Sequence, residues 1–147
     1  MISFYFVAKI LTFIYKNVKL IIMNIVSNIK YHIIFCTRYR KIIFNDKIFE
    51  EKFKEIIYQV AEENNLKILK LECIKEHVHI YLISNPKFSP NEIFKIFKLS
   101  TTSMIRKEFD YLSKSYSIFT KNYLVSTEKN ITEQEINEFI NSQKKRG

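Results

Sequence analysis

The sequence is short of the residues that build linkers, zinc sites and flexible loops. Its 147 residues include one Gly, two Pro, two Cys and no Trp. Without an internal repeat or a Gly- or Ser-rich linker, a chain of this length is expected to form one domain. Cys36 and Cys73 lack the CxxC spacing of a structural zinc site, so we expect two buried, reduced thiols in a cytoplasmic protein.

Acidic residues are also scarce. The 15 Asp and Glu residues stand against 24 Lys and Arg, which gives a formal net charge of +9 and an isoelectric point of about 9.5. Such a charge favours a polyanionic partner, for example nucleic acid. The codon bias of an AT-rich genome also explains an excess of Lys, Ile, Asn, Phe and Tyr, so charge alone is weak support for that partner.

The chain has no long uninterrupted apolar run, even near its N-terminus. Residues 1–22 are mostly apolar, but Lys9, Lys16 and Lys19 interrupt them before any stretch reaches the ~20 residues of a membrane span. This segment is either an amphipathic surface helix or an over-called start, with translation beginning at Met23. We prefer the second interpretation, in which residues 1–22 are an extension, residues 23–147 form the single domain, and no membrane is a partner.

From residue 24 onward, strand-like and helix-like patterns alternate. Two Ser/Thr-x-x-Glu capping boxes, at Ser89–Glu92 and Thr132–Glu135, mark the starts of the last two helices. The order β-α-β-β-α-β with an added C-terminal helix predicts an α+β, ferredoxin-like (RRM-like) fold with an antiparallel sheet. The expected strands cover residues 29–37, 66–74, 77–83 and 122–127.

The third of these strands contains His77 and His79. Residues i and i+2 of a strand point to the same face, so the two imidazoles project side by side and can share a divalent cation. A bare His-x-His pair is more often a partly exposed strand feature. The pair becomes a candidate metal site only with further support.

That support comes from the order of four motifs. Together they make residues 23–143 resemble the single-tyrosine HUH transposases of the insertion-sequence 200/605 group (IS200-like transposases). The motifs are the strand Tyr31–Arg40, the strand Glu76–Leu82, the helix from Lys98 to Phe109, and the segment Asn122–Thr127 followed by a helix that ends Phe139–Gln143.

The resemblance implies a defined chemistry. In that family two histidines hold Mg²⁺ or Mn²⁺, which polarises the scissile phosphate of single-stranded DNA, and a tyrosine on the last helix attacks the phosphorus. A Gln one helical turn after the tyrosine completes the metal site. The resemblance thus assigns His77, His79 and Gln143 as metal ligands, whereas without it Gln143 reads as an exposed residue of a terminal turn.

One position departs from the family. The tyrosine is expected four residues before Gln143, on the same helical face, and this chain has Phe139 there. A phenylalanine has no hydroxyl and cannot be the nucleophile. Packing beside Ile136 and Ile140 is an equally ordinary role for it, so we expect no intact catalytic nucleophile.

DNA binding does not need that hydroxyl. The resemblance implies single-stranded or hairpin DNA as partner and a homodimer, possibly replaced by a heterodimer with an active relative that supplies the tyrosine. Three classes compete: an active transposase, a degenerate transposase that mainly binds DNA, and an unrelated nucleic-acid-binding or regulatory ferredoxin-like module. The ordered motifs favour the second. Expected phosphate contacts are Arg38, Arg40, Lys41, Lys98, Arg106 and the tail Lys144–Arg146, and expected base-stacking residues are Tyr39 and Tyr123.

Overall fold

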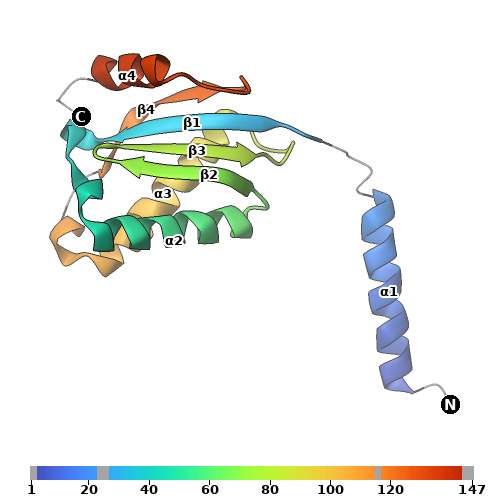
Figure 1. Ribbon diagram of the computed structural model, residues 1–147. Coiled ribbons are helices and arrows are strands. Elements are labelled where there is room, and N and C mark those ends of the chain that lie inside the picture. Colours follow the sequence, from blue (N-terminus) through green and yellow to red (C-terminus); the bar gives the residue numbers. More distant parts are fainter. Residues whose placement is uncertain (1–2, 23–26, 115–116, 144–147) are drawn as a thin grey trace.

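Four antiparallel strands form one sheet at the centre of the protein (Figure 1). The computed structural model describes residues 3–22, 27–114 and 117–143. The sheet order β2-β3-β1-β4 and the antiparallel pairing confirm the predicted ferredoxin-like α+β fold. The strands are β1 (Lys30–Thr37), β2 (Lys67–Ile74), β3 (His77–Ile83) and β4 (Phe119–Ser126).

Helices cover the two faces of the sheet unequally. Two long helices, α2 (Lys47–Glu63) and α3 (Pro90–Glu108), lie on one face, and the short α4 (Glu133–Ser142) lies on the other (Figure 1). Three 3₁₀ turns connect these elements: η1 (Arg38–Arg40), η2 (Ile43–Asn45) and η3 (Asp110–Leu112). The α4 face is therefore covered by one short helix and the opposite face by two long ones.

Local sequence signals fix the helix ends. Both predicted capping boxes are formed: the Ser89 and Thr132 hydroxyls each accept the backbone N–H three residues on, and the glutamates there reach back to the cap. Asp46 caps α2 by accepting from two backbone amides. Asn65, with φ of 55°, takes the left-handed conformation that ends α2.

Alternation along β1 divides its side chains between two packing regions. Ile33 and Phe35 point into the main core, where the Phe35 ring meets Phe94 and Phe119 at centroid distances of 5.5 and 5.1 Å. The alternate residues, Ile34 and Cys36, point to the opposite face and are fully buried there. Side chains at even positions of β1 therefore belong to the face that α4 covers.

Strand β4 begins earlier than the predicted 122. Its first residue, Phe119, is buried against Phe53 and Phe35 and pairs with Thr37 across a bulge that follows Phe35. The shift in register at the bulge lets β4 stay paired with β1 where its buried and exposed side chains no longer alternate regularly. The prediction missed residues 119–121 because the bulge interrupts the alternation of buried and exposed side chains.

The cysteines confirm the prediction of buried free thiols. Cys36 and Cys73 are both buried and unpaired in disulfides. Burial raises the pKa of each thiol to about 12, so the neutral form persists at physiological pH. Neither thiol is an electrostatically activated nucleophile.

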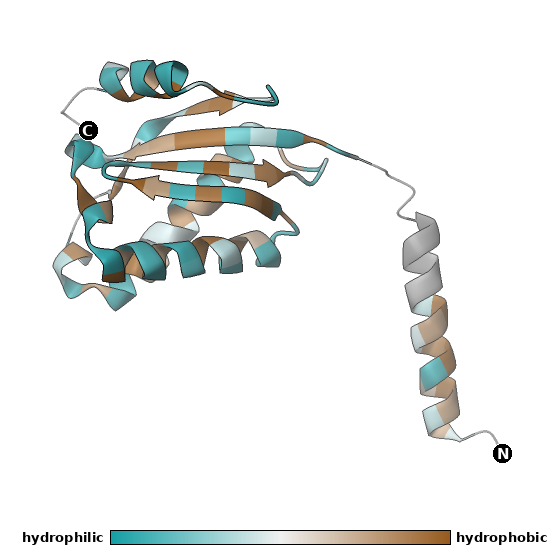
Figure 2. Cartoon of the chain, in the orientation of Figure 1, coloured by the Kyte–Doolittle hydropathy of each residue, from teal (hydrophilic) through white to brown (hydrophobic). Residues whose placement is uncertain are grey.

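The N-terminal segment forms the helix α1 (Phe4–Ile22), which stands clear of the sheet (Figure 1). Its described residues are largely apolar (Figure 2). Many of its side chains are exposed, including those of Phe4, Tyr5 and Phe13. Within the described residues, no helix combines the length and apolarity that crossing a bilayer requires. The division into an extension of residues 1–22 and a domain of residues 23–147 stays a prediction.

Candidate metal and nucleic-acid site

The three histidines of the chain share one face of the sheet. His77 and His79 alternate with the core residue Val78, so both lie on the face opposite α2 and α3. His32 lies on the same face of the neighbouring strand β1, opposite Tyr81. Sequence reasoning identified the first two and missed His32, whose position follows only from the register of β1 against β3.

His32 and His79 are in direct contact. His32 Nδ1 lies 2.9 Å from His79 Nε2, and the His32 ring stacks on Tyr81 at a centroid distance of 4.1 Å. At the far ends, His32 Nε2 lies 3.3 Å from the Lys129 carbonyl oxygen and His79 Nδ1 lies 3.5 Å from Glu72 Oε2. The result is a continuous polar chain across β2, β3 and β1.

Burial keeps the imidazoles of β3 neutral. The pKa of His79 falls to about 4, first because the ring is desolvated and then because His32 lies beside it, while Glu72 opposes the shift. Desolvation also lowers the pKa of His77, against the carboxylates of Glu76 and Glu72. At neutral pH the contact between His79 and Glu72 is therefore not an ion pair.

When the His32 and His79 rings are both neutral, they have one N–H too few to make all three of these contacts hydrogen bonds. A neutral imidazole carries a single N–H, so His32 and His79 together donate two hydrogen bonds. Glu72 and the Lys129 carbonyl oxygen both require a donor, which leaves the 2.9 Å nitrogen pair between the rings without one. A proton or a cation at this face removes that conflict.

His77 carries a second unmet donor or acceptor. Its Nδ1 atom is buried and has no hydrogen-bond partner among the described residues. Neutral imidazoles with available nitrogens are the form that divalent metals bind, so the histidine face fits a metal ion. Among the residues that the structure describes, no three His, Cys, Asp or Glu side chains are grouped to hold an ion.

Helix α4 brings Gln143 to this face. Gln143, the residue that follows the helix, is buried, and its Oε1 accepts from Asn122 Nδ2 of β4 at 3.4 Å. Ile140 is buried on the same side of α4, and Phe139 is half-buried. In the described part of the chain Gln143 hydrogen-bonds Asn122 and Ser142, not a histidine. Gln143 lies on the same face of the sheet as the histidines, and strand β1 separates β4, which carries Asn122, from β3, which carries His77 and His79.

Comparison with known proteins identifies the family. The sequence model described as "Transposase IS200 like" matches residues 25–143, most of the chain and all four sheet strands. The chain belongs to the IS200-like transposase family. Membership of this family indicates a function in DNA transposition.

Two relatives match this IS200-like transposase at low sequence identity. It is 30% identical over 106 residues to the transposase for insertion sequence element IS200 of Salmonella typhimurium, which covers 68% of this chain and 67% of that one. It is 23% identical over 121 residues to the ISDra2 transposase TnpA of Deinococcus radiodurans, with 80% and 86% covered.

Two solved structures share the fold. A Deinococcus radiodurans crystal structure assigned as a transposase superposes with a TM-score of 0.74 at 24% identity, covering 82% of this chain and 94% of that one. A REP-associated tyrosine transposase bound to a REP hairpin gives 0.53 at 10% identity, with 78% and 64% covered.

The basic turn of this IS200-like transposase is strained. Tyr39 and Arg40 have φ values of 61° and 52°, which cost roughly 1–2 kcal/mol for each non-glycine residue. Arg40 Nη2 lies 3.6 Å from Glu76 Oε1, so this predicted phosphate contact is engaged with the residue before His77. Arg38 is half-buried, while Tyr39 and Lys41 are exposed.

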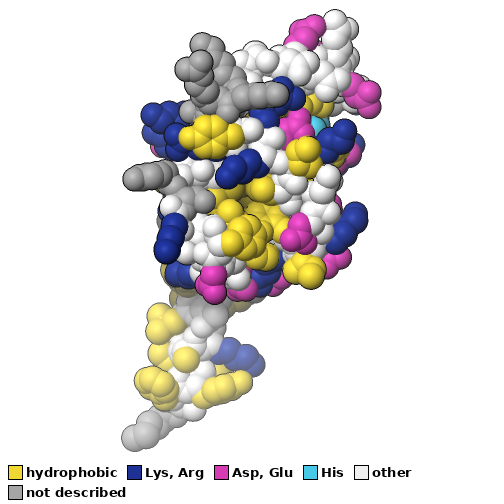
Figure 3. Space-filling view, turned by 90° about the vertical axis from the view of Figure 1, so that its left-hand side faces the viewer, with side chains coloured by type: hydrophobic (Ala, Val, Ile, Leu, Met, Phe, Trp, Pro, Cys, Tyr) yellow, Lys and Arg dark blue, Asp and Glu magenta, His cyan; other side chains and the backbone are white. Residues whose placement is uncertain are grey.

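The other predicted contacts lie on α3 and beyond. Lys98 is half-buried over the Phe94 ring, and its pKa is lowered by burial and then by the charges of Lys121 and Arg38, so these cations share one patch. Figure 3, which views the end of the sheet where β1 runs into η1, shows lysines and arginines around apolar side chains. Arg106 lies in the last turn of α3, half-buried. The tail 144–146 falls outside the described residues.

Tyr123, a predicted base-stacking residue, is half-buried. The Tyr123 ring packs against the core and stacks on Phe94 at a centroid distance of 4.4 Å. Tyr123 pairs with Phe35, and so it shares the core face of the sheet. One side of its ring therefore packs on the core, whereas Tyr39 is half exposed. Base stacking by these two residues stays a prediction.

Proposed function

We propose that this IS200-like transposase binds single-stranded or hairpin DNA across its histidine face and does not cleave it alone. The observation that carries the proposal is the inner side of α4, where buried Gln143 follows half-buried Phe139 by one helical turn. The turn that would present a nucleophile to the histidine face thus presents a hydrocarbon ring. Phosphotyrosine chemistry requires an oxygen at that position.

A divalent cation, Mg²⁺ or Mn²⁺, belongs to the proposal. His77, His79 and Gln143 would hold it, and when bound it polarises a phosphate oxygen of the DNA. His32 orients His79 through the 2.9 Å contact, as the outer partners of metal-bound histidines commonly do. Buried Gln143 contributes an amide oxygen, a ligand that suits these hard cations.

The DNA partner is supported by charge and by a relative. Arg38, Lys98 and Lys121 share a basic patch on the same end of the sheet as Lys41, which suits a phosphate backbone. The distant REP-associated transposase is bound to a hairpin, which supports hairpin DNA as a ligand of this chain. The corresponding location of the protein is the cytoplasm.

Self-association is a separate part of the proposal. A homodimer, or a heterodimer with an active relative, would let this chain contribute its histidines while the partner contributes a tyrosine. Light scattering of the purified protein should then give twice the 17.8 kDa mass of one chain. A monomeric mass at micromolar concentrations would remove this part.

The salt dependence of DNA binding tests the interface. Each phosphate contact on a single strand contributes about −0.7 to the slope of log K against log salt. Lys98→Gln should make the slope shallower by about 0.7, because it removes one cation from the patch that includes Arg38. Fluorescence anisotropy with a labelled single-stranded oligonucleotide measures the slope.

Lys67→Gln is the matched control, because Lys67 is an exposed lysine at the start of the edge strand β2. It removes the same charge outside the patch and should leave the slope unchanged. An affinity that does not vary with salt would refute the electrostatic interface.

A further inference from the structure

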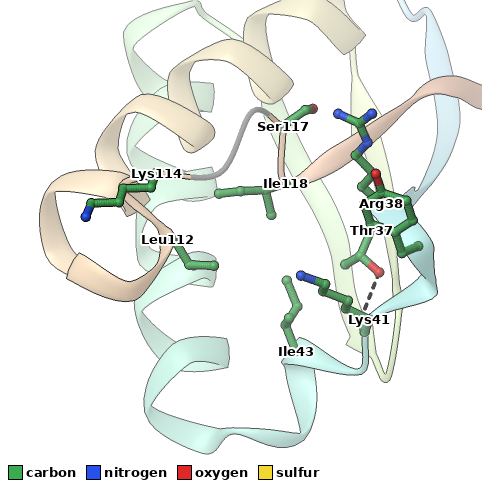
Figure 4. A pocket seen from close by; sticks show the side chains of 9 residues that line it. Thr37, Arg38, Lys41, Ile43, Leu112, Lys114, Ser117 and Ile118 are labelled. Atoms are coloured by element: carbon green, nitrogen blue, oxygen red, sulfur yellow. Dashed lines mark hydrogen bonds between the residues drawn. The ribbon is translucent and has the colours of Figure 1, made fainter. Parts of the chain in front are cut away.

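A small cavity lies beside the basic turn, between the end of β1 and the segment that leads into β4 (Figure 4). Its volume is about 220 Å³, below the ~300 Å³ at which pockets for drug-sized ligands begin, so it suits a single ring. The lining residues are Thr37, Arg38, Tyr39, Lys41, Ile43, Leu112, Lys114, Ser117 and Ile118.

The lining combines an apolar wall with cations. Ile43, Leu112 and Ile118 form the wall, and the Lys41 ammonium points into the space beside it (Figure 4). Arg38 also lines the cavity, and its Nε is buried with no hydrogen-bond partner among the described residues. Among the described residues that line the cavity there is no Asp or Glu. An apolar ring with an attached anion complements such a cavity.

The cations of the strained turn make two kinds of contact, an ion pair and contacts with an aromatic ring. Arg40 is drawn to Glu76, while Arg38 and Lys41 flank the Tyr39 ring at 5.2 and 6.0 Å. Hydrogen bonds hold the turn in place: Arg38 N–H donates to the Ile118 carbonyl oxygen at 2.7 Å, and the Thr37 hydroxyl donates to the Lys41 carbonyl oxygen at 2.8 Å. The left-handed residues thus leave two cations and an exposed aromatic ring at the cavity.

The cavity is also tied to the histidine strand. Thr37 N–H donates to the Glu76 carbonyl oxygen at 2.8 Å, and Glu76 directly precedes His77. Arg38, in the cavity lining, belongs to the same basic patch as Lys98 and Lys121. A DNA strand that contacts both Arg38 and His77 would therefore lie next to residues of the cavity lining.

We infer that the cavity binds one nucleotide of a single DNA strand. The base lies against Ile43, Leu112 and Ile118, and the attached phosphate contacts Arg38 and Lys41. This inference rests on the proposed binding of single-stranded DNA. It adds a site that reads one base by shape and stacking, next to the sequence-independent phosphate contacts.

An abasic scan tests the cavity. A labelled eight-nucleotide dT strand, with one abasic site at each position in turn, is titrated with the full chain by fluorescence anisotropy. Removing the base that enters the cavity should weaken binding about five-fold or more, and the other positions should matter less. Ile43→Phe, which fills the cavity, should remove this dependence on position.

Ile42→Phe is the matched control, because Ile42 is exposed and outside the cavity lining. It should keep the position dependence. If Ile43→Phe fails to fold by circular dichroism, Lys41→Gln replaces it and should weaken binding of the intact strand about ten-fold relative to Lys67→Gln.

The outcomes separate the two proposals. Tight, salt-dependent binding with a flat abasic scan would overturn the nucleotide cavity and leave the proposed DNA binding intact. Equal effects of Lys41→Gln and Lys67→Gln would also overturn the cavity. Failure to bind any single strand would overturn both.

Discussion

Substituting tyrosine for Phe139 is expected to turn a chain that forms no covalent DNA adduct into one that does. Phe139 is half-buried on the inner side of α4, one turn before Gln143, which is buried at the histidine face. A tyrosine there keeps the volume of the ring and adds the one atom that phosphoryl transfer needs.

The measurement is a denaturing gel. The unmodified chain and Phe139→Tyr are each incubated with a labelled single-stranded hairpin and Mn²⁺, and a covalent adduct appears as a band that survives denaturation. We expect this band only with the variant, and only while the divalent ion is present. Chelation of Mn²⁺ by EDTA should abolish it.

Phe88→Tyr supplies the matched control, since Phe88 is another half-buried phenylalanine that packs on the core. It should give no adduct. An adduct with the unmodified chain would show that a nucleophile other than residue 139 is present. Failure of a folded, DNA-binding Phe139→Tyr chain to form one would show that the position is not aligned for attack.

The parts of the site that sequence reasoning identified follow from local spacing. The i, i+2 rule put His77 and His79 on one face, and the i, i+4 rule related Phe139 to Gln143, because both rules depend only on the geometry of one element. The capping boxes were predicted for the same reason. Strand boundaries were accurate wherever alternation was regular, as in β3.

The parts that sequence reasoning missed depend on how elements pair. His32 joins the site because β1 and β3 are in a register that sets it opposite Tyr81 and against His79. Tyr123 packs on the core because its pairing with Phe35 directs it to that face. Arg40 forms an ion pair with Glu76, and this contact joins two turns that are distant in sequence. None of these pairings is encoded within a single segment.

Metal binding is expected to depend steeply on His77 and His79 and less steeply on His32. The buried Nδ1 of His77 has no hydrogen-bond partner among the described residues, and the rings of His77 and His79 are neutral, so neither must lose a proton before it coordinates an ion. His77→Ala and His79→Ala should each weaken Mn²⁺ binding more than about 100-fold, because only two nitrogen ligands are proposed. His32→Phe keeps a ring against Tyr81 but loses the nitrogen that meets His79, and the loss of such an orienting partner costs about 10- to 100-fold.

Thermal unfolding in the presence and absence of Mn²⁺ gives the readout. A ligand at 100 times its Kd stabilises the folded state by about 2.7 kcal/mol, which raises the melting temperature of a domain of this size by several degrees. We expect this increase for the unmodified chain, its loss on adding EDTA, and its absence in His77→Ala and His79→Ala. Melting in EDTA alone controls for damage to the fold, which matters most at buried His79.

The gradient among the variants distinguishes the two arrangements that the histidine face allows. If His77 and His79 hold the ion, His77→Ala abolishes the Mn²⁺-dependent increase and His32→Phe reduces it. If instead the ion takes the place of the missing hydrogen between His32 and His79, His32→Phe abolishes the increase and His77→Ala leaves it nearly intact. That second result would move the metal from the pair that the strand pattern predicts to the pair that the sheet register brings together.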